Sequence, residues 1–132
     1  MIDFEWPIRV YYEDTDSGGV VYHSNYLNFM ERARTEWLRS LGFEQDDLIT
    51  EHQCIFAVHS MQLKFKRPAK FNDSLIVRSQ LIKAVGARME FEQKIVRDGE
   101  LLCEAAVKIA CLDVNRFRPK SLPSFILTEI TK

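Results

Sequence analysis

The sequence predicts an α+β fold in which one long central helix is wrapped by a curved antiparallel sheet of five or more strands. Apolar side chains recur at steps of three and four through residues 25 to 41, as in an amphipathic helix. Five other segments alternate apolar and polar side chains, as strands with one buried face do. Short turn sequences join several of these segments, and such connections favour antiparallel neighbours.

The first expected strand covers residues 8 to 14 (IRVYYED), where the two faces of the strand differ in polarity. The segment that follows, TDSGGVVYHSN, breaks this alternation with a cluster of polar residues. Gly18 and Gly19 can adopt a positive φ without steric cost, so this segment is expected to form a loop.

Both ends of the expected helix carry sequence signals. Ser24 or Asn25 can cap its N-terminus, and Gly42 follows its last apolar position, where a glycine commonly ends a helix. This helix carries the long apolar stripe of the chain, so we expect it to cover the sheet. The polar segment of residues 44 to 54 is expected to hold a short helical turn.

Four further alternating segments are expected to be strands that form an antiparallel meander. They cover residues 57 to 65, 75 to 81, 89 to 95 and 101 to 111. Pro68 ends the first of them because proline cannot donate to a sheet, and Asp98 with Gly99 gives a tight hairpin signal before the last. The proline-containing tail after Arg116 is expected to be an edge segment.

Length and composition narrow the class of protein. The 132 residues match one domain spanning 1–132, and 18 Lys and Arg against 19 Asp and Glu give a formal net charge of −1. That balance argues against a nucleic acid or an anionic membrane as a partner. The three cysteines lack metal-binding spacing, and neither a secretory leader nor a membrane-spanning apolar run occurs. We therefore expect a cytoplasmic protein without a membrane span, a metal or another cofactor.

The richest group of polar residues surrounds the Gly-Gly loop and ends where the long helix begins; it comprises Glu13, Asp14, Asp16, His23, Ser24 and Asn25. A helix N-terminus offers unpaired N–H groups and a positive dipole end, which can polarise a carbonyl. A carboxylate facing that site can activate water or attack the carbonyl itself, and a thioester needs little more because thiolate leaves readily. The same residue types are also ordinary turn formers, helix caps and metal ligands. His59 shares the apolar face of its expected strand, where a core role is commoner than a catalytic one.

Residues 10 to 38 (VYYEDTDSGGVVYHSNYLNFMERARTEWL) closely resemble the signature of the hotdog-fold acyl-CoA thioesterases. The segment KFKRPAKFND, residues 64 to 73, and the expected strand order extend the resemblance over nearly the whole chain. The chain resembles the branch that includes hydroxybenzoyl-CoA thioesterase and, more closely, the bacterial thioesterases associated with the Tol-Pal cell-envelope system. The resemblance implies a hotdog fold and hydrolysis of acyl-CoA to a free acid and CoA.

The resemblance also implies roles for individual residues. The second Asp of a D-x-D pattern is the catalytic carboxylate of that family and corresponds to Asp16, as nucleophile or general base. The backbone N–H near His23 is expected to polarise the thioester carbonyl, and the His23 side chain is expected to orient substrate or water. Gly19 and Tyr22 belong to the matching segment and are expected at the substrate. Glu31, on the helix, is the second choice because another hotdog branch places its carboxylate there.

The family further implies a homodimer or homotetramer with CoA bound in a cleft between subunits. Arg67, Lys70 and Arg88 are expected to contact the CoA phosphates, although each is equally compatible with a solvated surface cation. Acyl carrier protein is a further candidate partner. Two other functions stay open at this point: a hydratase or dehydratase of the same fold, and a non-catalytic acyl-binding or envelope scaffold protein.

Overall fold

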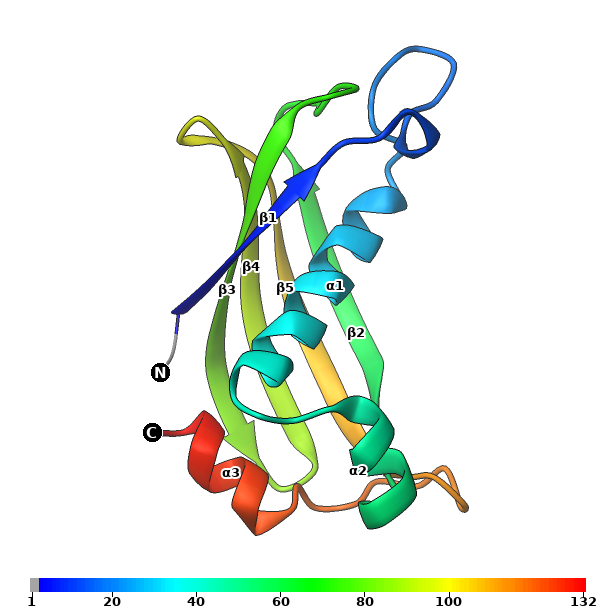
Figure 1. The fold of residues 1–132 in the computed structure, drawn as a ribbon, viewed down its shortest axis with the longest axis vertical. Helices are drawn as coiled ribbons and strands as arrows, with labels where there is room; N and C mark the ends of the chain where they lie inside the picture. The colour runs from blue at the N-terminus through cyan, green and yellow to red at the C-terminus, as the bar shows by residue number, and fades with distance from the viewer. Residues whose placement is uncertain (1–2) are drawn as a thin grey trace.

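The computed structural model describes residues 3–132, which form a five-stranded antiparallel sheet wrapped around one long helix (Figure 1). The strands lie in the order β1-β3-β4-β5-β2. Their bounds are β1 Asp3–Arg9, β2 Cys54–Phe65, β3 Ser74–Val85, β4 Arg88–Arg97 and β5 Glu100–Asp113. The helices are α1 Asn25–Ser40, α2 Gln45–His52 and α3 Ser124–Ile130, with a 3-10 turn, η1, at Tyr12–Asp14. The expected fold class is confirmed.

The meander contains three strands rather than the expected four. β3, β4 and β5 are consecutive neighbours, and Asp98 and Gly99 form the hairpin turn with φ angles of 51° and 79°. β2 instead lies at the far edge and pairs with β5, from Cys54 opposite Asp113 to Phe65 opposite Cys103. The connection between β2 and β3 is too long for a tight hairpin, so the two strands need not be neighbours.

The first strand also differs from its prediction. β1 begins at Asp3, ends at Arg9 and pairs with β3. The residues that were expected to continue it turn into η1, where the Asp14 carboxylate accepts the N–H of Tyr11 at 2.8 Å. A local side-chain acceptor thus competes with the sheet for this backbone, and Tyr12 is left 79% exposed.

α1 lies across the inner face of the sheet and supplies one side of the core (Figure 1). Its buried residues are Tyr26, Phe29, Met30, Ala33, Arg34, Trp37 and Leu38. They pack in one cluster with the inward-facing side chains of the meander, which include Leu75, Val77, Leu81, Phe91, Ile95 and Val107. Gly42 follows the helix with a φ of 94°, as the sequence predicted.

The tail after Arg116 is mostly not an edge segment. It makes one bridge, between Leu112 and Pro119, and then forms α3. Ile126 and Ile130 of α3 are fully buried, and their spacing of four residues places both on the same helix face. The prolines of the tail obscured this helix in the sequence, yet a proline is well tolerated where a helix begins.

β2 is an edge strand with an irregularity in its middle. Its pairing register with β5 shifts between Val58 and Ser60, so the alternation of side chains changes face there. His59 is consequently exposed and does not share the apolar face that the alternation predicted. Val58 and Phe65 are 49% and 54% exposed, so this open edge carries apolar side chains.

Candidate active site

The loop between η1 and α1 is a short hairpin held by backbone hydrogen bonds. Thr15 and Val21 form a bridge, and the N–H of Asp16 donates to the C=O of Val20 at 2.9 Å. Gly19 closes the turn by donating to the C=O of Asp16 at 3.1 Å, with a φ of 81° that favours glycine. The hairpin therefore presents Asp16 at the first position of a tight turn.

Asp16 is exposed, and one backbone group orients its carboxylate. Its Oδ1 accepts the N–H of Gly18 at 2.8 Å, whereas Oδ2 has no protein donor within residues 3–132. A Cβ added at Gly18 would lie 3.2 Å from this Oδ1, so a side chain there would crowd the carboxylate. One oxygen of the carboxylate is thus held, and the other is available to a water molecule or a carbonyl carbon.

The carboxylate that reaches the start of α1 belongs to Asp14. Its Oδ1 accepts Asn25 Nδ2–H at 2.8 Å, its Oδ2 accepts the N–H of Tyr11 at 2.8 Å, and the residue is only 5% exposed. We expected the carboxylate opposite the helix start to be that of Asp16. Within one chain, the carboxylate at that position belongs to Asp14. The sequence could not distinguish the two because both aspartates lie in the same polar segment of the loop.

The residues just before α1 leave backbone donors available. Ser24 forms no side-chain cap, and the Asn25 amide is bonded to Asp14, so neither expected cap is formed. In the described part of the chain, the backbone N–H groups of His23 and Ser24 donate to no protein acceptor. Together with the positive end of the helix dipole, such N–H groups can stabilise the negative charge that develops on a carbonyl oxygen.

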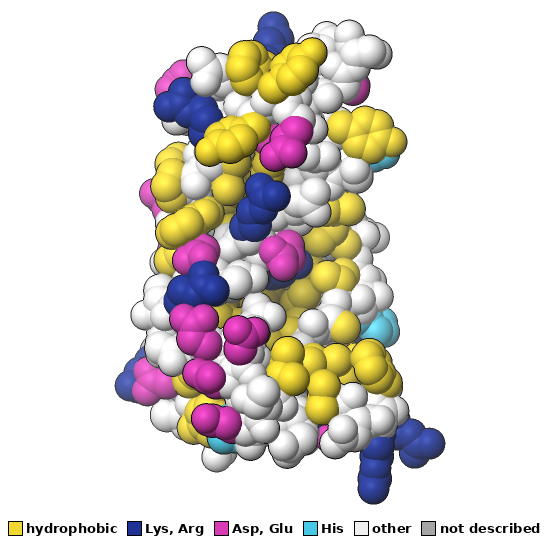
Figure 2. All heavy atoms as spheres, turned by 45° about the vertical axis from the view of Figure 1, so that its right-hand side comes forward, with side chains coloured by type: hydrophobic (Ala, Val, Ile, Leu, Met, Phe, Trp, Pro, Cys, Tyr) yellow, Lys and Arg dark blue, Asp and Glu magenta, His cyan; other side chains and the backbone are white. Residues whose placement is uncertain are grey.

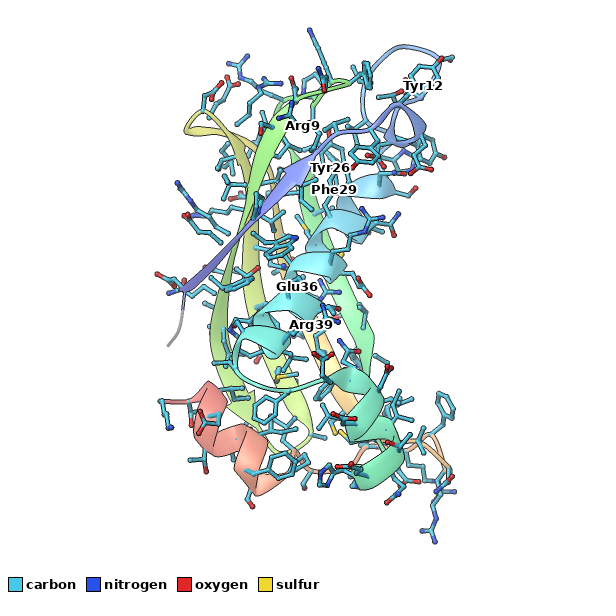
Figure 3. All side chains as sticks on the ribbon, in the orientation of Figure 1. Arg9, Tyr12, Tyr26, Phe29, Glu36 and Arg39 are labelled. Atoms are coloured by element: carbon cyan, nitrogen blue, oxygen red, sulfur yellow. The ribbon has the colours of Figure 1, made fainter. Side chains whose placement is uncertain are left out.

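A surface hollow of about 260 Å³ opens beside this helix start. It is lined by Val21, His23, Tyr26, Phe65, Lys66, Arg67 and Pro68. Tyr26, at the loop end of α1 (Figure 3), is 3% exposed, and its Oη accepts the N–H of Ala69 at 3.0 Å. Burial raises the pKa of Tyr26, so it stays a neutral phenol. The structure thus brings two predicted site residues, His23 and Arg67, to one hollow.

Aromatic side chains surround the loop. The rings of Tyr22 and His23, both exposed, have centroids 4.4 Å apart, and Tyr12 meets Phe71 edge to face at 5.8 Å. Figure 2 shows hydrophobic side chains gathered on the surface at this end of the molecule. Exposed rings of this kind offer apolar contact area to a ligand or a second chain.

The three predicted phosphate-binding cations do not lie together in one chain. Lys70 forms a bridge with Val20 of the loop and is exposed. Arg67 lies at the hollow, where its Nε is 3.0 Å from an oxygen of Glu100. Arg88 begins β4 beside the β3–β4 hairpin, which Figure 1 shows at the end of the sheet opposite to the loop. Arg67 and Lys70 are therefore near the helix start, and Arg88 is not.

Glu31 lies at a second hollow of about 100 Å³, farther along α1. Arg34, Trp37, Phe56 and Val58 also line this hollow. Glu31 is exposed, and it follows the first residue of α1 by six positions, which corresponds to about 9 Å along the helix axis. It is therefore separated from the unpaired N–H groups, whereas Val58 brings this hollow to the open edge of β2.

Residues 3–132 contain neither a metal-binding cluster nor a membrane-spanning helix. No group of three or more His, Cys, Asp and Glu side chains there is arranged to hold a metal ion. None of the helices in that range is both long enough and apolar enough to span a membrane.

Known proteins share both the sequence pattern and the fold. Residues 10–130 match the sequence profile of the thioesterase-like superfamily. The acyl-CoA thioesterase YbgC of Haemophilus influenzae is 46% identical over 120 residues, which cover 91% of this chain and 88% of that protein. The acyl-CoA thioester hydrolase YbgC of Escherichia coli O157:H7 is 43% identical over 127 residues, covering 96% and 94%. The crystal structure of a probable thioesterase from Bartonella henselae has a TM-score of 0.88 at 36% identity, covering 92% of this chain and 100% of that one.

Proposed function

The chain belongs to the thioesterase-like superfamily, and we propose that it is an acyl-CoA thioesterase with Asp16 as its catalytic carboxylate. Relatives named as acyl-CoA thioesterases match it over most of its length, and the chain accordingly hydrolyses acyl-CoA to a free acid and CoA. The observation that carries the catalytic assignment is the loop itself. It joins an exposed carboxylate that has one free oxygen to a helix start whose N–H groups have no protein acceptor in residues 3–132.

The two ends of this loop would have different roles in the reaction. The N–H of His23 would donate to the thioester carbonyl oxygen and stabilise it as negative charge develops. Asp16 would either take a proton from water as the water oxygen adds to the carbonyl carbon, or attack that carbon itself to form an anhydride that water opens. In both routes the C–S bond breaks and CoA leaves as a thiolate, which then takes up a proton. Both routes fit an exposed carboxylate with one free oxygen.

The complete site would require a second copy of the chain. Asp16 is exposed and the hollow beside α1 is open, so one chain leaves the substrate in contact with solvent. The edge strand β2 has twelve residues, and within residues 3–132 its backbone is unpaired along one side, where the side chains of Val58 and Phe65 are also exposed. Such an edge favours pairing with another strand. We expect a homodimer through β2, alone or within a homotetramer, with the cleft between subunits.

CoA would lie with its phosphates near Arg67 and Lys70. Both residues are exposed and flank the loop and the hollow, so their charges are accessible to a phosphate. Gly19 and Tyr22 lie in the same loop and would contact the substrate near its thioester. Arg88 would reach CoA only from the second subunit, because it begins β4 at the end of its own sheet that lies opposite to the loop. A cytoplasmic location, a link to the Tol-Pal system and acyl carrier protein as a second thioester donor are further parts of the proposal.

A thiol-release assay with a panel of short, aromatic and long acyl-CoAs tests the function. We expect stoichiometric release of CoA and free acid from at least one member of the panel. A hydratase would consume an unsaturated acyl-CoA without releasing thiol, and a scaffold protein would leave every member intact. Silence across the whole panel, from protein that is folded by circular dichroism, would contradict the proposed activity.

A further inference from the structure

The loop contains a second carboxylate that the proposed reaction does not use. Asp14 is 5% exposed, and three hydrogen bonds converge on it. Its side chain accepts Asn25 Nδ2–H and the N–H of Tyr11, both at 2.8 Å, and its C=O accepts the N–H of Tyr22 at 2.9 Å. These bonds join η1, the end of the loop and the first residue of α1.

We propose that Asp14 and Asn25 form a positioning pair that fixes the carboxylate of Asp16 relative to the N-terminus of α1. The inference rests on the proposed function, because it takes Asp16 as the catalytic carboxylate. Asp16 follows Asp14 by two residues, and the N–H of His23 precedes Asn25 by two residues. The hydrogen bond between Asp14 and Asn25 therefore links the two halves of the site across the loop.

The hydrogen bonds of both side chains are used to hold η1, the loop and the start of α1 together. Both carboxylate oxygens of Asp14 are occupied, so it has no free oxygen for water. Asn25 was expected to cap α1, but its side chain bonds to Asp14 instead. Because the N-cap position of α1 is Ser24, the Asn25 amide is not required as a cap and is available to hold the loop through Asp14.

The pair also determines where negative charge sits at the helix start. A buried carboxylate is acceptable there because two N–H donors and the positive end of the helix dipole stabilise it. A second carboxylate in place of the Asn25 amide would face the first across a hydrogen-bond distance. Two such groups cannot both stay ionised without moving apart, and they share a proton when the pH allows it.

The first test is Asn25→Asp, which replaces the donating amide with a carboxylate. At pH 8 we expect kcat for acyl-CoA to fall about tenfold or more, because the loop shifts relative to the helix start, with KM changed by less than about twofold. At about pH 5 to 6 a shared proton restores the bond, so kcat relative to the parent enzyme should recover. If the pair had a purely structural role, the variant would have a lower melting temperature, but its kcat relative to the parent enzyme would not depend on pH in this way.

The double variant Asp14→Asn with Asn25→Asp exchanges the partners. The amide introduced at position 14 can donate to the carboxylate introduced at position 25, and its oxygen can accept the N–H of Tyr11. The same bonds therefore form with the charge moved to α1. We expect kcat at pH 8 to return to within about threefold of the parent enzyme. Asn28→Asp is the matched control, since it adds the same charge to the first turn of α1 at an exposed position and should change nothing.

The outcomes distinguish the positioning pair from the catalytic assignment. Normal kcat in Asn25→Asp at pH 8, or a double variant as impaired as that single variant, would overturn the positioning pair. If Asn25→Asp does not fold, Asn25→Ala takes its place: it removes the donor without adding charge and should still lower kcat with little change in KM. The variant Asp16→Asn is assayed in parallel, because full activity there would refute the catalytic assignment and not the pair alone.

Discussion

Two hydrogen-bond networks anchor α1, and they differ in where they lie. The loop network joins Tyr11, Asp14 and Asn25 at the helix start, in a segment whose neighbouring residues are exposed. The mid-helix network joins Met30, Arg34, Ser79 and Gln93, whose three side-chain partners Arg34, Ser79 and Gln93 are 8%, 2% and 0% exposed. The same helix is thus tied to the sheet in the middle and to a solvent-facing loop at one end. Buried polar groups therefore serve stability in one place and the geometry of a site in the other.

The mid-helix network is centred on Gln93. Its Oε1 accepts Arg34 Nη1–H at 2.8 Å, and its Nε2 donates to the C=O of Met30 at 3.0 Å and to Ser79 Oγ at 2.9 Å. Burial lowers the pKa of Arg34, and the nearby charge of Glu31 opposes this shift. Because a buried guanidinium depends on its acceptors, this network should be costly to break and silent in catalysis.

The largest effect on stability is expected from Gln93→Leu. It removes the acceptor of the buried Arg34 guanidinium, and the free energy of unfolding should fall by about 3 kcal/mol. Urea unfolding followed by circular dichroism measures this loss, and kcat below the melting temperature should stay unchanged. The double variant Arg34→Met with Gln93→Leu should lose less, because both partners become apolar. A fall in kcat larger than the loss of folded protein would show that the mid-helix network also serves the site.

Tyr26→Phe should have the next largest effect. The variant leaves the fully buried N–H of Ala69 without its acceptor, which should lower the free energy of unfolding by about 1 to 2 kcal/mol. The same bond ties residues 66 to 69 to α1 beside the hollow, so KM for acyl-CoA should rise as well. Thermal unfolding and steady-state kinetics measure the two effects. An unchanged KM would mean that Tyr26, like the mid-helix network, contributes to stability and not to substrate binding.

Arg67→Ala should affect binding and leave folding intact. An exposed cation contributes up to about 1 kcal/mol to a phosphate contact, so KM should rise about fivefold at low salt and less at high salt. Arg88→Ala is the comparison, because Arg88 lies at the opposite end of the sheet and should change KM less. A larger rise in KM for Arg88→Ala than for Arg67→Ala would mean that Arg88 of the second subunit makes the stronger contact with CoA.

The smallest effect concerns acid stability. Burial raises the pKa of Asp73, but the N–H of Lys70 at 2.8 Å and the guanidinium of Arg97 at 2.7 Å lower it, and the net shift is downward. A depressed pKa in the folded state contributes stability above the unfolded pKa, and this contribution is lost as the pH falls through the folded value. Asp73→Asn should therefore flatten the acid side of the stability profile without affecting kcat. A profile as steep as that of the parent would assign the acid sensitivity to other carboxylates.

The sequence predicted the elements that a regular period defines. The helix from Asn25, its end before Gly42 and the meander through Asp98 and Gly99 follow from periodicity and turn chemistry, which act locally. The place of β2 and the helix α3 were missed. Strand order depends on which sheet edges meet in space, and α3 is held by tertiary burial of Ile126 and Ile130. No local pattern records the strand order, and the prolines before α3 obscured the spacing of its two isoleucines.

The candidate site, like the fold, was predicted only in part from the sequence. The residue types around the loop identified a carboxylate beside a helix start, and the resemblance to a family singled out Asp16. The separate roles of the two aspartates were not predicted, because they depend on which carboxylate turns inward to meet Tyr11 and Asn25. Arg67 and Arg88 looked equivalent as isolated cations. They lie at opposite ends of the sheet because Arg67 follows the end of β2, whereas Arg88 begins β4 beside the β3–β4 hairpin.

The decisive quantity is the kcat of Asp16→Asn on the acyl-CoA that the parent enzyme hydrolyses best. This variant is nearly isosteric and can keep the turn bond from Gly18, but it lacks a basic oxygen. We predict an unchanged melting temperature and a kcat at least about a hundredfold below that of the parent. A folded Asp16→Asn protein with the parent's kcat would contradict the assignment of Asp16 as the catalytic carboxylate.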